Sequence, residues 1–320
     1  MVGPPLIPQE IFLLERYSSV EYFGQLRDIW AEMIAHVERC LDHFMQNLPL
    51  DYRNRPLPEQ PDAVWGERVL PNFRDTLQSL NDGYIALTAG DVTGLEYCHG
   101  PLNDFKGQAD FSVSWMSRQD QDIYGALLNK AVIMAGNIQF TSGAYWNPLT
   151  LSSRYNPDSR GPLDAPVSWP GYRPVANTSV ASGDRLPVSG IYLPDVDNSC
   201  AEFLSTEYEI APPCRVHVGD KDLLDPDTGV KYGQQALNEE RPCVWHLIEK
   251  IPDGEGRPVP SLLSEIKVRA EAGAPCPQSG FYFTPAKSDS RRYFSRGELM
   301  PQVGSDYGAT IWQWDQKQEA

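Results

Sequence analysis

The sequence predicts an α+β protein, in which a helical part over residues 1–140 is followed by a β-rich part over residues 141–320. Two observations predict this class. Before Gly136, apolar residues recur at spacings of three and four, which is the period of an amphipathic helix. After Gly136 this period disappears, Pro and Gly become frequent, and short aromatic runs stand between turn residues. Such runs are typical of short strands.

Three helices are expected in the first part. The longest begins at Ser18 or Ser19, either of which can cap it, and ends before Pro49. Its apolar stripe consists of Phe23, Leu26, Trp30, Met33, Val37, Cys40 and Phe44. The polar residues off this stripe are expected in solvent: His36, Arg39, Asp42 and His43. A second helix is expected over 71–89, weakened at Gly83, and a third over 120–135, whereas 100–115 gives no clear pattern.

A recurring phrase organises the second part. The pattern Ser-Gly-x-Tyr, followed within three residues by Pro, occurs at 142–148, 189–194 and 279–285. Ser-Gly marks a turn, the aromatic residues favour a strand, and Pro ends it. The second and third copies also share a tail, at 199–203 and 290–294, and a later Trp-bearing run. The β-rich part therefore holds two or three Ser-Gly-x-Tyr-x-Pro units.

The expected strands follow from these runs: 144–146, 190–193, 215–218, 243–251, 264–271, 280–284 and 309–314. Residues 149–188 are rich in Pro, Ser, Gly and Asn and are expected to form a long loop. The aromatics that recur in each unit are expected in the core: Tyr192, Tyr282, Trp245 and Trp312. The alternative is that these rings are exposed and bind a sugar or a protein surface.

Charge restricts the classes of partner. The formal net charge is −16 and the isoelectric point is near 4.7, which disfavours nucleic acid and anionic membranes and favours a cationic partner. Solubility alone is the competing interpretation. No stretch approaches the roughly 20 apolar residues of a membrane span, and the N-terminus does not resemble a signal peptide. Together with six cysteines in no C-x-x-C pair, this predicts a cytoplasmic protein with free thiols.

The acidic residues concentrate between positions 195 and 227, where only Arg215 and Lys221 oppose them. Because binding residues commonly lie on loops between strands, part of this segment is expected to face a partner. The candidate partner-binding residues are Asp195, Asp197, Glu202, Glu207, Asp220, Asp222, Asp225 and Asp227.

No catalytic residue, metal or cofactor is expected, because the chain has none of the common nucleophile, zinc-protease, phosphate-loop or dinucleotide motifs. Two C-x-x-H pairs, at 214–217 and 243–246, have the residue types of a zinc site. However, both lie on expected strands, where residues three apart point to opposite faces. The run 225–229 resembles the start of a calcium loop but lacks its closing glutamate, which favours a plain turn.

A family resemblance rests on the C-terminal residues. The run 276–286, then 290–294, 297–301 and 307–314, resembles a recurrent module of bacterial immunity proteins of polymorphic toxin systems, the predicted families numbered 71 and 72. The runs 189–202 and 142–148, with the helical region before them, are also similar to that group. The resemblance implies a cytoplasmic, non-enzymatic protein that binds one cognate toxin, such as a nuclease effector of the type VI secretion system. The resemblance does not identify which residues of this chain would contact the toxin.

Physical reasoning agrees with that implication, because the cleft of a nuclease is basic and an acidic inhibitor is steered toward it. Inhibition by occluding the cleft and inhibition by altering toxin assembly both remain open. Two other classes are kept as alternatives. One is a carboxylate-dependent hydrolase that uses His99 or His246, and the other is a carbohydrate-binding protein that uses the repeated aromatics.

Overall fold

The computed structural model of the chain describes residues 6–252, 269–277, 279–284, 287, 290–303 and 310–315. The chain forms two compact units, 1–257 and 258–320. The first unit contains all the described helices and the strands up to Lys250, and the second contains the remaining strands. The α+β class predicted from the sequence is confirmed, with helices first and antiparallel sheets after them.

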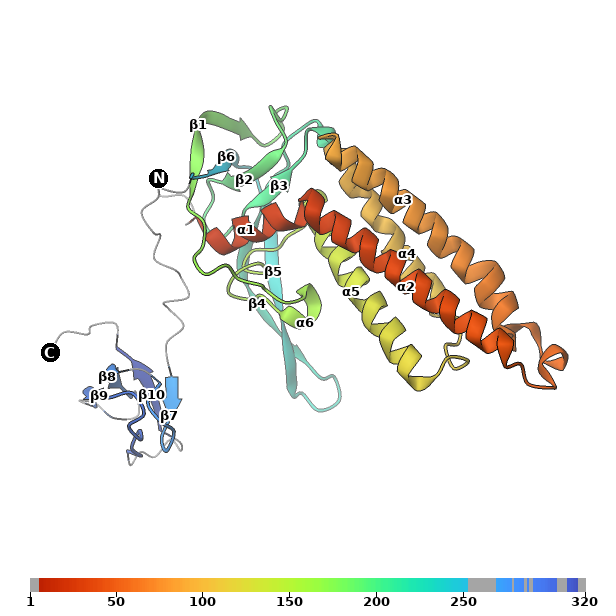
Figure 1. Cartoon of the computed structure of the whole chain (residues 1–320). Coiled ribbons are helices and arrows are strands. Elements are labelled where there is room, and N and C mark those ends of the chain that lie inside the picture. Colours follow the sequence, from red (N-terminus) through yellow and green to blue (C-terminus); the bar gives the residue numbers. More distant parts are fainter. Residues whose placement is uncertain are drawn as a thin grey trace. The chain divides into compact units, whose positions relative to one another are not determined.

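The described helices of the first unit are α1 (Pro8–Tyr17), α2 (Val20–Gln46), α3 (Leu70–Thr88), α4 (His99–Gln108) and α5 (Arg118–Ser142), with the short α6 (Pro157–Arg160) after them. Helices α2 to α5 lie side by side, and α1 leads into the start of α2 (Figure 1). A π-helical segment, Asp62–Val69, runs directly into α3, and shorter 3-10 turns lie at 52–54, 57–59 and 92–98. Helix α2 packs against both α3 and α5. No described helix has the length and apolarity that a bilayer crossing requires.

Local chemistry explains the ends and the contacts of these helices. The Ser19 hydroxyl accepts a hydrogen bond from the Tyr22 amide at 3.1 Å, so Ser19 caps α2 as the sequence predicts. The Trp30 indole donates to the carbonyl of Phe73 at 2.9 Å, which joins α2 to α3 inside the core. Gly83 stays inside α3 because a Cβ there would lie 2.7 Å from the carbonyl oxygen of Gly94. The glycine thus marks a close crossing, and the helix is continuous through it.

Three helical expectations need correction. Helix α1 and helix α4 were not predicted, and α5 runs to Ser142 instead of ending near 135. His36 was expected in solvent, but it is buried, with 6% of its surface exposed. The stripe on α2 described only one contact face, whereas α2 has helices on two sides, and His36 lies on the side of α5.

The first unit contains a four-stranded antiparallel sheet with the order β1-β6-β2-β3. These strands are β1 (Tyr172–Ala181), β2 (Gly190–Pro194), β3 (Glu202–Leu204) and β6 (Val244–Lys250). One face belongs to the helical core through Tyr172, Ile191, Phe203 and Ile248. Because the sheet and the helices share this core, the compact unit extends to 257 and does not divide near residue 140.

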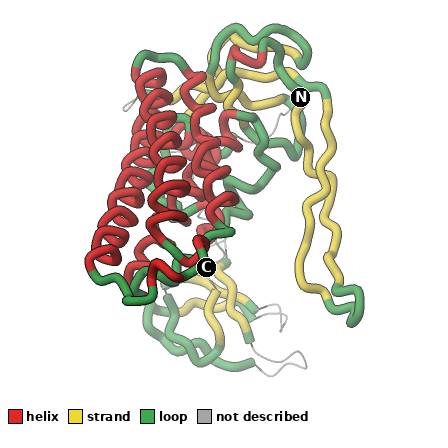
Figure 2. Tube along the Cα trace, turned by 90° about the vertical axis from the view of Figure 1, so that its right-hand side faces the viewer, coloured by secondary structure: helices red, strands yellow, loops and turns green. Residues whose placement is uncertain are grey.

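The opposite face of this sheet covers a second core, which includes Tyr192, Leu204, Cys214 and Trp245. Between β3 and β6 the chain forms a hairpin of β4 (Cys214–Leu224) and β5 (Lys231–Arg241), which pair only with each other among the described strands. We call this hairpin the arm. It extends away from the sheet as a long, narrow ribbon (Figure 2).

The second unit repeats the topology of the first sheet. Its strands β7 (Arg269–Glu271), β8 (Gly280–Phe283), β9 (Arg292–Phe294) and β10 (Ile311–Trp314) have the order β7-β10-β8-β9, which is the same succession along the chain. We call the two sheets module 1 (strands β1, β2, β3 and β6) and module 2. Each has its own apolar core.

Hydrogen bonds recur at matching positions of the two modules. The Trp245 indole donates to the carbonyl of Pro212 at 2.7 Å, and the Trp312 indole donates to that of Pro301 at 2.8 Å. Two serine hydroxyls also accept from equivalent backbone amides: Ser189 from Thr206 at 2.9 Å and Ser279 from Arg296 at 2.8 Å. The four repeated aromatics are buried to 0–1% exposure, which confirms that they are core residues.

The first copy of the phrase is not a module. Residues 144–146 were expected as a strand, but they form the turn after α5, and Trp146 joins the helical core. Residues 149–188 are not one loop, because they contain α6 and β1. Strand β1 was missed because its face toward solvent is polar and its run contains Pro174. The first five residues of the expected strand 264–271 lie outside the described residues, and β7 is described from Arg269.

Candidate partner-binding surface

The arm leaves module 1 between β3 and β6 and is largely exposed. From Val218 onward most of its side chains face solvent on both sides of the ribbon. Its distal end carries large apolar residues in solvent: Leu224 is 54% exposed, Val230 63% and Tyr232 70%. Exposed apolar side chains gathered at one place indicate an interaction surface more often than scattered ones do. Module 2 has only residues 295–310 between its corresponding strands, so the arm is an insertion into a repeated fold.

The end of the arm is a turn built by one aspartate. Asp225 Oδ1 accepts hydrogen bonds from the amides of Asp227 and Thr228, at 3.1 and 2.8 Å, and from the Thr228 hydroxyl at 2.8 Å. These donors lower the pKa of the Asp225 carboxyl, because they stabilise its charged form. The turn predicted for 225–229 is what this segment forms. Asp227 lies on the turn with its carboxylate exposed.

Two acidic residues of the arm already have partners within the chain. The two terminal guanidinium nitrogens of Arg154 donate to the two carboxylate oxygens of Asp220, at 2.9 and 2.6 Å. This pairing lowers the pKa of Asp220. Asp222 lies 2.7 Å from the ammonium of Lys231 and accepts from Gln234, so its pKa is also lowered. A bidentate guanidinium–carboxylate pair has a fixed geometry. Asp220 therefore ties the proximal part of the arm to the segment that follows α5.

The other predicted acids lie along the edge of module 1. Asp195 Oδ1 accepts from the amide of Val244 at 2.8 Å, and so it also joins β2 to the start of β6. Asp197 and Glu207 are exposed. Glu207 lies in a short turn, where its amide donates a hydrogen bond to the Ser205 hydroxyl. The predicted set is thus not one patch: it is divided between the edge of the sheet, the arm and the interior.

Among the predicted acidic residues, Glu202 is the one that lies in the interior of the protein. It is 4% exposed and lies in a cavity of about 280 Å³ at the base of the arm, lined also by Tyr145, Arg215 and Glu240. Burial raises the pKa of the Glu202 carboxyl well above its ordinary value, although Arg215 and the Trp146 amide favour the charged form. Its Oε2 atom has no hydrogen-bond partner among the described residues. A buried, unpartnered carboxylate oxygen is costly and is suited to a cationic or proton-donating ligand.

A second buried carboxyl lies close enough to Glu202 and to Cys200 to raise the pKa of both. Glu10 of α1 is 3% exposed and accepts a hydrogen bond from the Ser152 hydroxyl at 2.7 Å. Burial is the largest cause of its perturbation and raises its pKa to about 7, against the opposing effects of Ser152 and the Ala201 backbone. Both carboxyls raise the pKa of the fully buried Cys200 further. No sequence pattern indicates this pair, because Glu10 and Glu202 are far apart in the chain.

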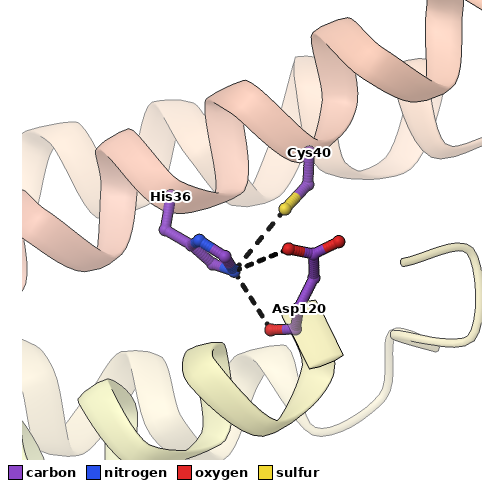
Figure 3. A group of neighbouring side chains, drawn as sticks. All are labelled: His36, Cys40 and Asp120. Atoms are coloured by element: carbon purple, nitrogen blue, oxygen red, sulfur yellow. Dashed lines mark hydrogen bonds and ion pairs between the residues drawn. The ribbon is translucent and has the colours of Figure 1, made fainter. Parts of the chain in front are cut away.

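The potential metal ligands do not include either C-x-x-H pair. Cys214 is buried beside the Cys243 thiol, whereas His217 lies 3.7 Å from Asp220 on the other face of β4. Among the described residues, one cluster has the right donor atoms: His36, Cys40 and Asp120, between α2 and the first turn of α5 (Figure 3). Sequence reasoning missed it, although His and Cys four residues apart on a helix share one face.

Known proteins offer no template for these features. No family model, no curated protein and no solved structure matches the chain.

Proposed function

We propose that the chain is an immunity protein that binds a basic protein toxin in a stoichiometric complex, through the arm and the cavity at its base. The proposal joins the family resemblance of the C-terminal residues to one structural observation. This observation is the exposed distal end of the arm, where Leu224, Val230 and Tyr232 surround an acidic turn. Large apolar side chains that lie together in solvent indicate an interaction surface.

Electrostatics supports a cationic partner. The chain carries a net charge of −16, which attracts a basic protein over a range set by the ionic strength. In the cavity, Glu202 and Glu240 present carboxyl groups to a space that fits one side chain. A lysine or arginine of the partner entering there would supply the missing donor for Glu202 Oε2 and would favour its ionised form. Binding would then release a proton from Glu202.

The partner would be a cognate effector, such as a nuclease of a type VI secretion system, and the complex would form in the cytoplasm. Neither a nucleic acid nor a membrane surface suits a chain of this charge, because both are anionic. The arm can act by filling the substrate cleft of the toxin or by holding the toxin in an inactive assembly. The carbohydrate-binding alternative has less support, because the repeated rings are buried and a sugar cannot reach them.

The decisive experiment shortens the arm. Residues 218–237 are replaced by Asn-Gly, which joins the paired residues His217 and Asn238 by a two-residue turn. The product of the adjacent reading frame is co-expressed with each form and tested for co-purification and toxicity. We expect the full chain to co-purify and protect, and the shortened chain to melt at the same temperature but to lose both properties. Protection by the shortened chain would contradict the assignment of the arm.

A second measurement separates the effect of charges at the proposed interface from the effect of the net charge of the chain on the association rate. Asp195, Asp197, Asp225 and Asp227 are changed to Asn, which keeps a side-chain oxygen for the bonds that Asp195 and Asp225 accept. The control variant neutralises the same number of exposed acids on the helices: Glu21, Glu32, Asp42 and Asp122. We expect the first variant to associate more slowly at low salt than the control, because charges at the rim of an interface set the association rate. Equal rates for the two variants would mean that only net charge matters.

A further inference from the structure

Three side chains with metal-binding atoms meet between α2 and α5, away from the arm (Figure 3). His36 and Cys40 lie one helical turn apart on α2, and Asp120 lies in the first turn of α5. The donor atoms are the His36 Nε2, the Cys40 thiol sulfur and an Asp120 carboxylate oxygen, all within 4.8 Å of one another. His36 is buried, whereas Cys40 and Asp120 are partly exposed.

The spacing of these atoms matches the edges of a tetrahedral metal site. Zinc bonds to sulfur at about 2.3 Å and to imidazole nitrogen at about 2.0–2.1 Å, which at a tetrahedral angle places the two ligand atoms about 3.6 Å apart. The Cys40 sulfur and the His36 Nε2 are 3.5 Å apart. The His36 Nε2 and Asp120 Oδ1 are 3.8 Å apart, against about 3.3 Å for bonds to nitrogen and oxygen. Rotation of the partly exposed carboxylate can close this difference, at the expense of the hydrogen bond that its Oδ2 accepts from the Ser117 hydroxyl.

We propose that His36, Cys40 and Asp120 form a binding site for a divalent cation of the zinc type, with solvent as the fourth ligand. A thiolate and an imidazole select zinc or a similar transition ion over magnesium and calcium, which prefer oxygen ligands. The half-exposed position of Cys40 and Asp120 leaves a side of the cluster open to solvent. The site is independent of the arm and of the proposed toxin binding.

Binding would exchange the present hydrogen bonds for coordinate bonds. In the structure, the His36 Nε2 lies 3.0 Å from the Asp120 carbonyl oxygen, which can only accept, so Nε2 carries the ring proton in this contact. To bind the ion through Nε2, the neutral imidazole would move this proton to Nδ1 and give up the contact. Burial, with the neighbouring Asp120 carboxylate, raises the pKa of Cys40 to about 11, so the thiol carries a proton that the ion displaces into solvent. The ion would then connect α2 directly to the first turn of α5, which otherwise depends on Ser117 as its cap.

Cobalt(II) titration of the metal-free full chain tests the proposal, because a tetrahedral cobalt–thiolate site gives a charge-transfer band in the near ultraviolet and strong visible bands. We expect one equivalent of Co²⁺ to produce both and one equivalent of Zn²⁺ to remove them. Cys40→Ser should abolish the charge-transfer band, and Asp120→Asn should weaken binding at least tenfold. Asp42→Asn and His43→Gln, exposed on the same helix, are the matched controls and should bind like the unchanged chain.

Two outcomes would overturn the site. One is a Co²⁺ spectrum without the thiolate band, and the other is a band that persists in Cys40→Ser, which would assign binding to other cysteines. Because a variant could also lose binding by misfolding, circular dichroism of each metal-free variant is compared first. As a readout independent of spectra, Zn²⁺ should raise the melting temperature of the unchanged chain and protect Cys40 from alkylation, located by peptide mapping. Unchanged alkylation of Cys40 in saturating Zn²⁺ would equally contradict the proposal.

Discussion

The buried carboxyl of Glu10 makes the stability of the first unit depend on pH in an unusual direction. Its pKa is about 7 in the folded chain against an ordinary value of 4.5, because burial penalises the charged form more than Ser152 and the Ala201 backbone favour it. The folded chain therefore binds this proton more tightly than the unfolded chain does. The stabilising contribution is fully present below pH 4.5 and is lost as the pH rises through 7.

The magnitude follows from the same two values. Between 4.5 and about 7, at about 1.4 kcal/mol per pKa unit, the loss amounts to about 3 kcal/mol. Glu202, whose pKa burial also raises, adds to the loss in the same direction. Carboxyls with lowered pKa values, such as Asp220 and Asp222, stabilise the folded chain in their charged form. Their contribution to stability is lost only as the pH falls below about 4, which is outside this window.

Urea unfolding of the full chain and of Glu10→Gln between pH 5 and pH 8 measures this contribution. Gln cannot ionise, and its oxygen can still accept from Ser152. We expect the free energy of unfolding of the unchanged chain to fall relative to that of the variant by about 2.5 kcal/mol between pH 5 and pH 8, because part of the loss already occurs below pH 5. Glu21→Gln, at an exposed carboxyl, should run parallel to the unchanged chain. Parallel curves for Glu10→Gln and the unchanged chain would refute the assignment.

Two further predictions concern packing. Tyr192→Ala and Tyr282→Ala should each cost on the order of 3–5 kcal/mol, and hydrogen exchange should locate the loss in the affected module only; unchanged protection in both would show that the rings are not core. Gly83→Ala should destabilise the chain by about 1–3 kcal/mol, because its Cβ meets the Gly94 carbonyl, whereas Gly136→Ala, with open space around it, should gain up to about 1 kcal/mol. Melting curves that rank these two glycine variants the other way would contradict the close crossing.

The helices show what sequence patterns can and cannot predict. Helices α2, α3 and α5 were found because each carries a long apolar period, and α2 also has its predicted cap at Ser19. Helix α4 was missed because Gly100, Pro101 and Gly107 interrupt its pattern, and tertiary packing against α3 and α5 outweighs those weak propensities. The burial of His36 was missed because a stripe reports one contact face, while α2 has two.

For the strands and the acidic segment, too, the sequence predicts some features and misses others. Short strands rich in aromatics were found at β2, β6, β8 and β10, because aromatic and β-branched residues favour strands. Strand β5 was missed because its ribbon is exposed on both faces and so shows no alternation. The charges of residues 195–227 were visible in the sequence, but their roles depend on pairing. Only the structure shows that Asp220 meets Arg154 and that Glu202 is inside.

The base of the arm has a consequence for how this protein can diversify. Cys214 and Arg241 are paired in register, so the chain leaves module 1 and returns to it at neighbouring points. From Val218 to Leu237 the ribbon is largely exposed, so substitutions, insertions or deletions there do not have to be accommodated by either apolar core. The two modules can therefore stay constant while the length and the residues of the ribbon drift, and a lineage could change its recognition target without passing through unstable intermediates.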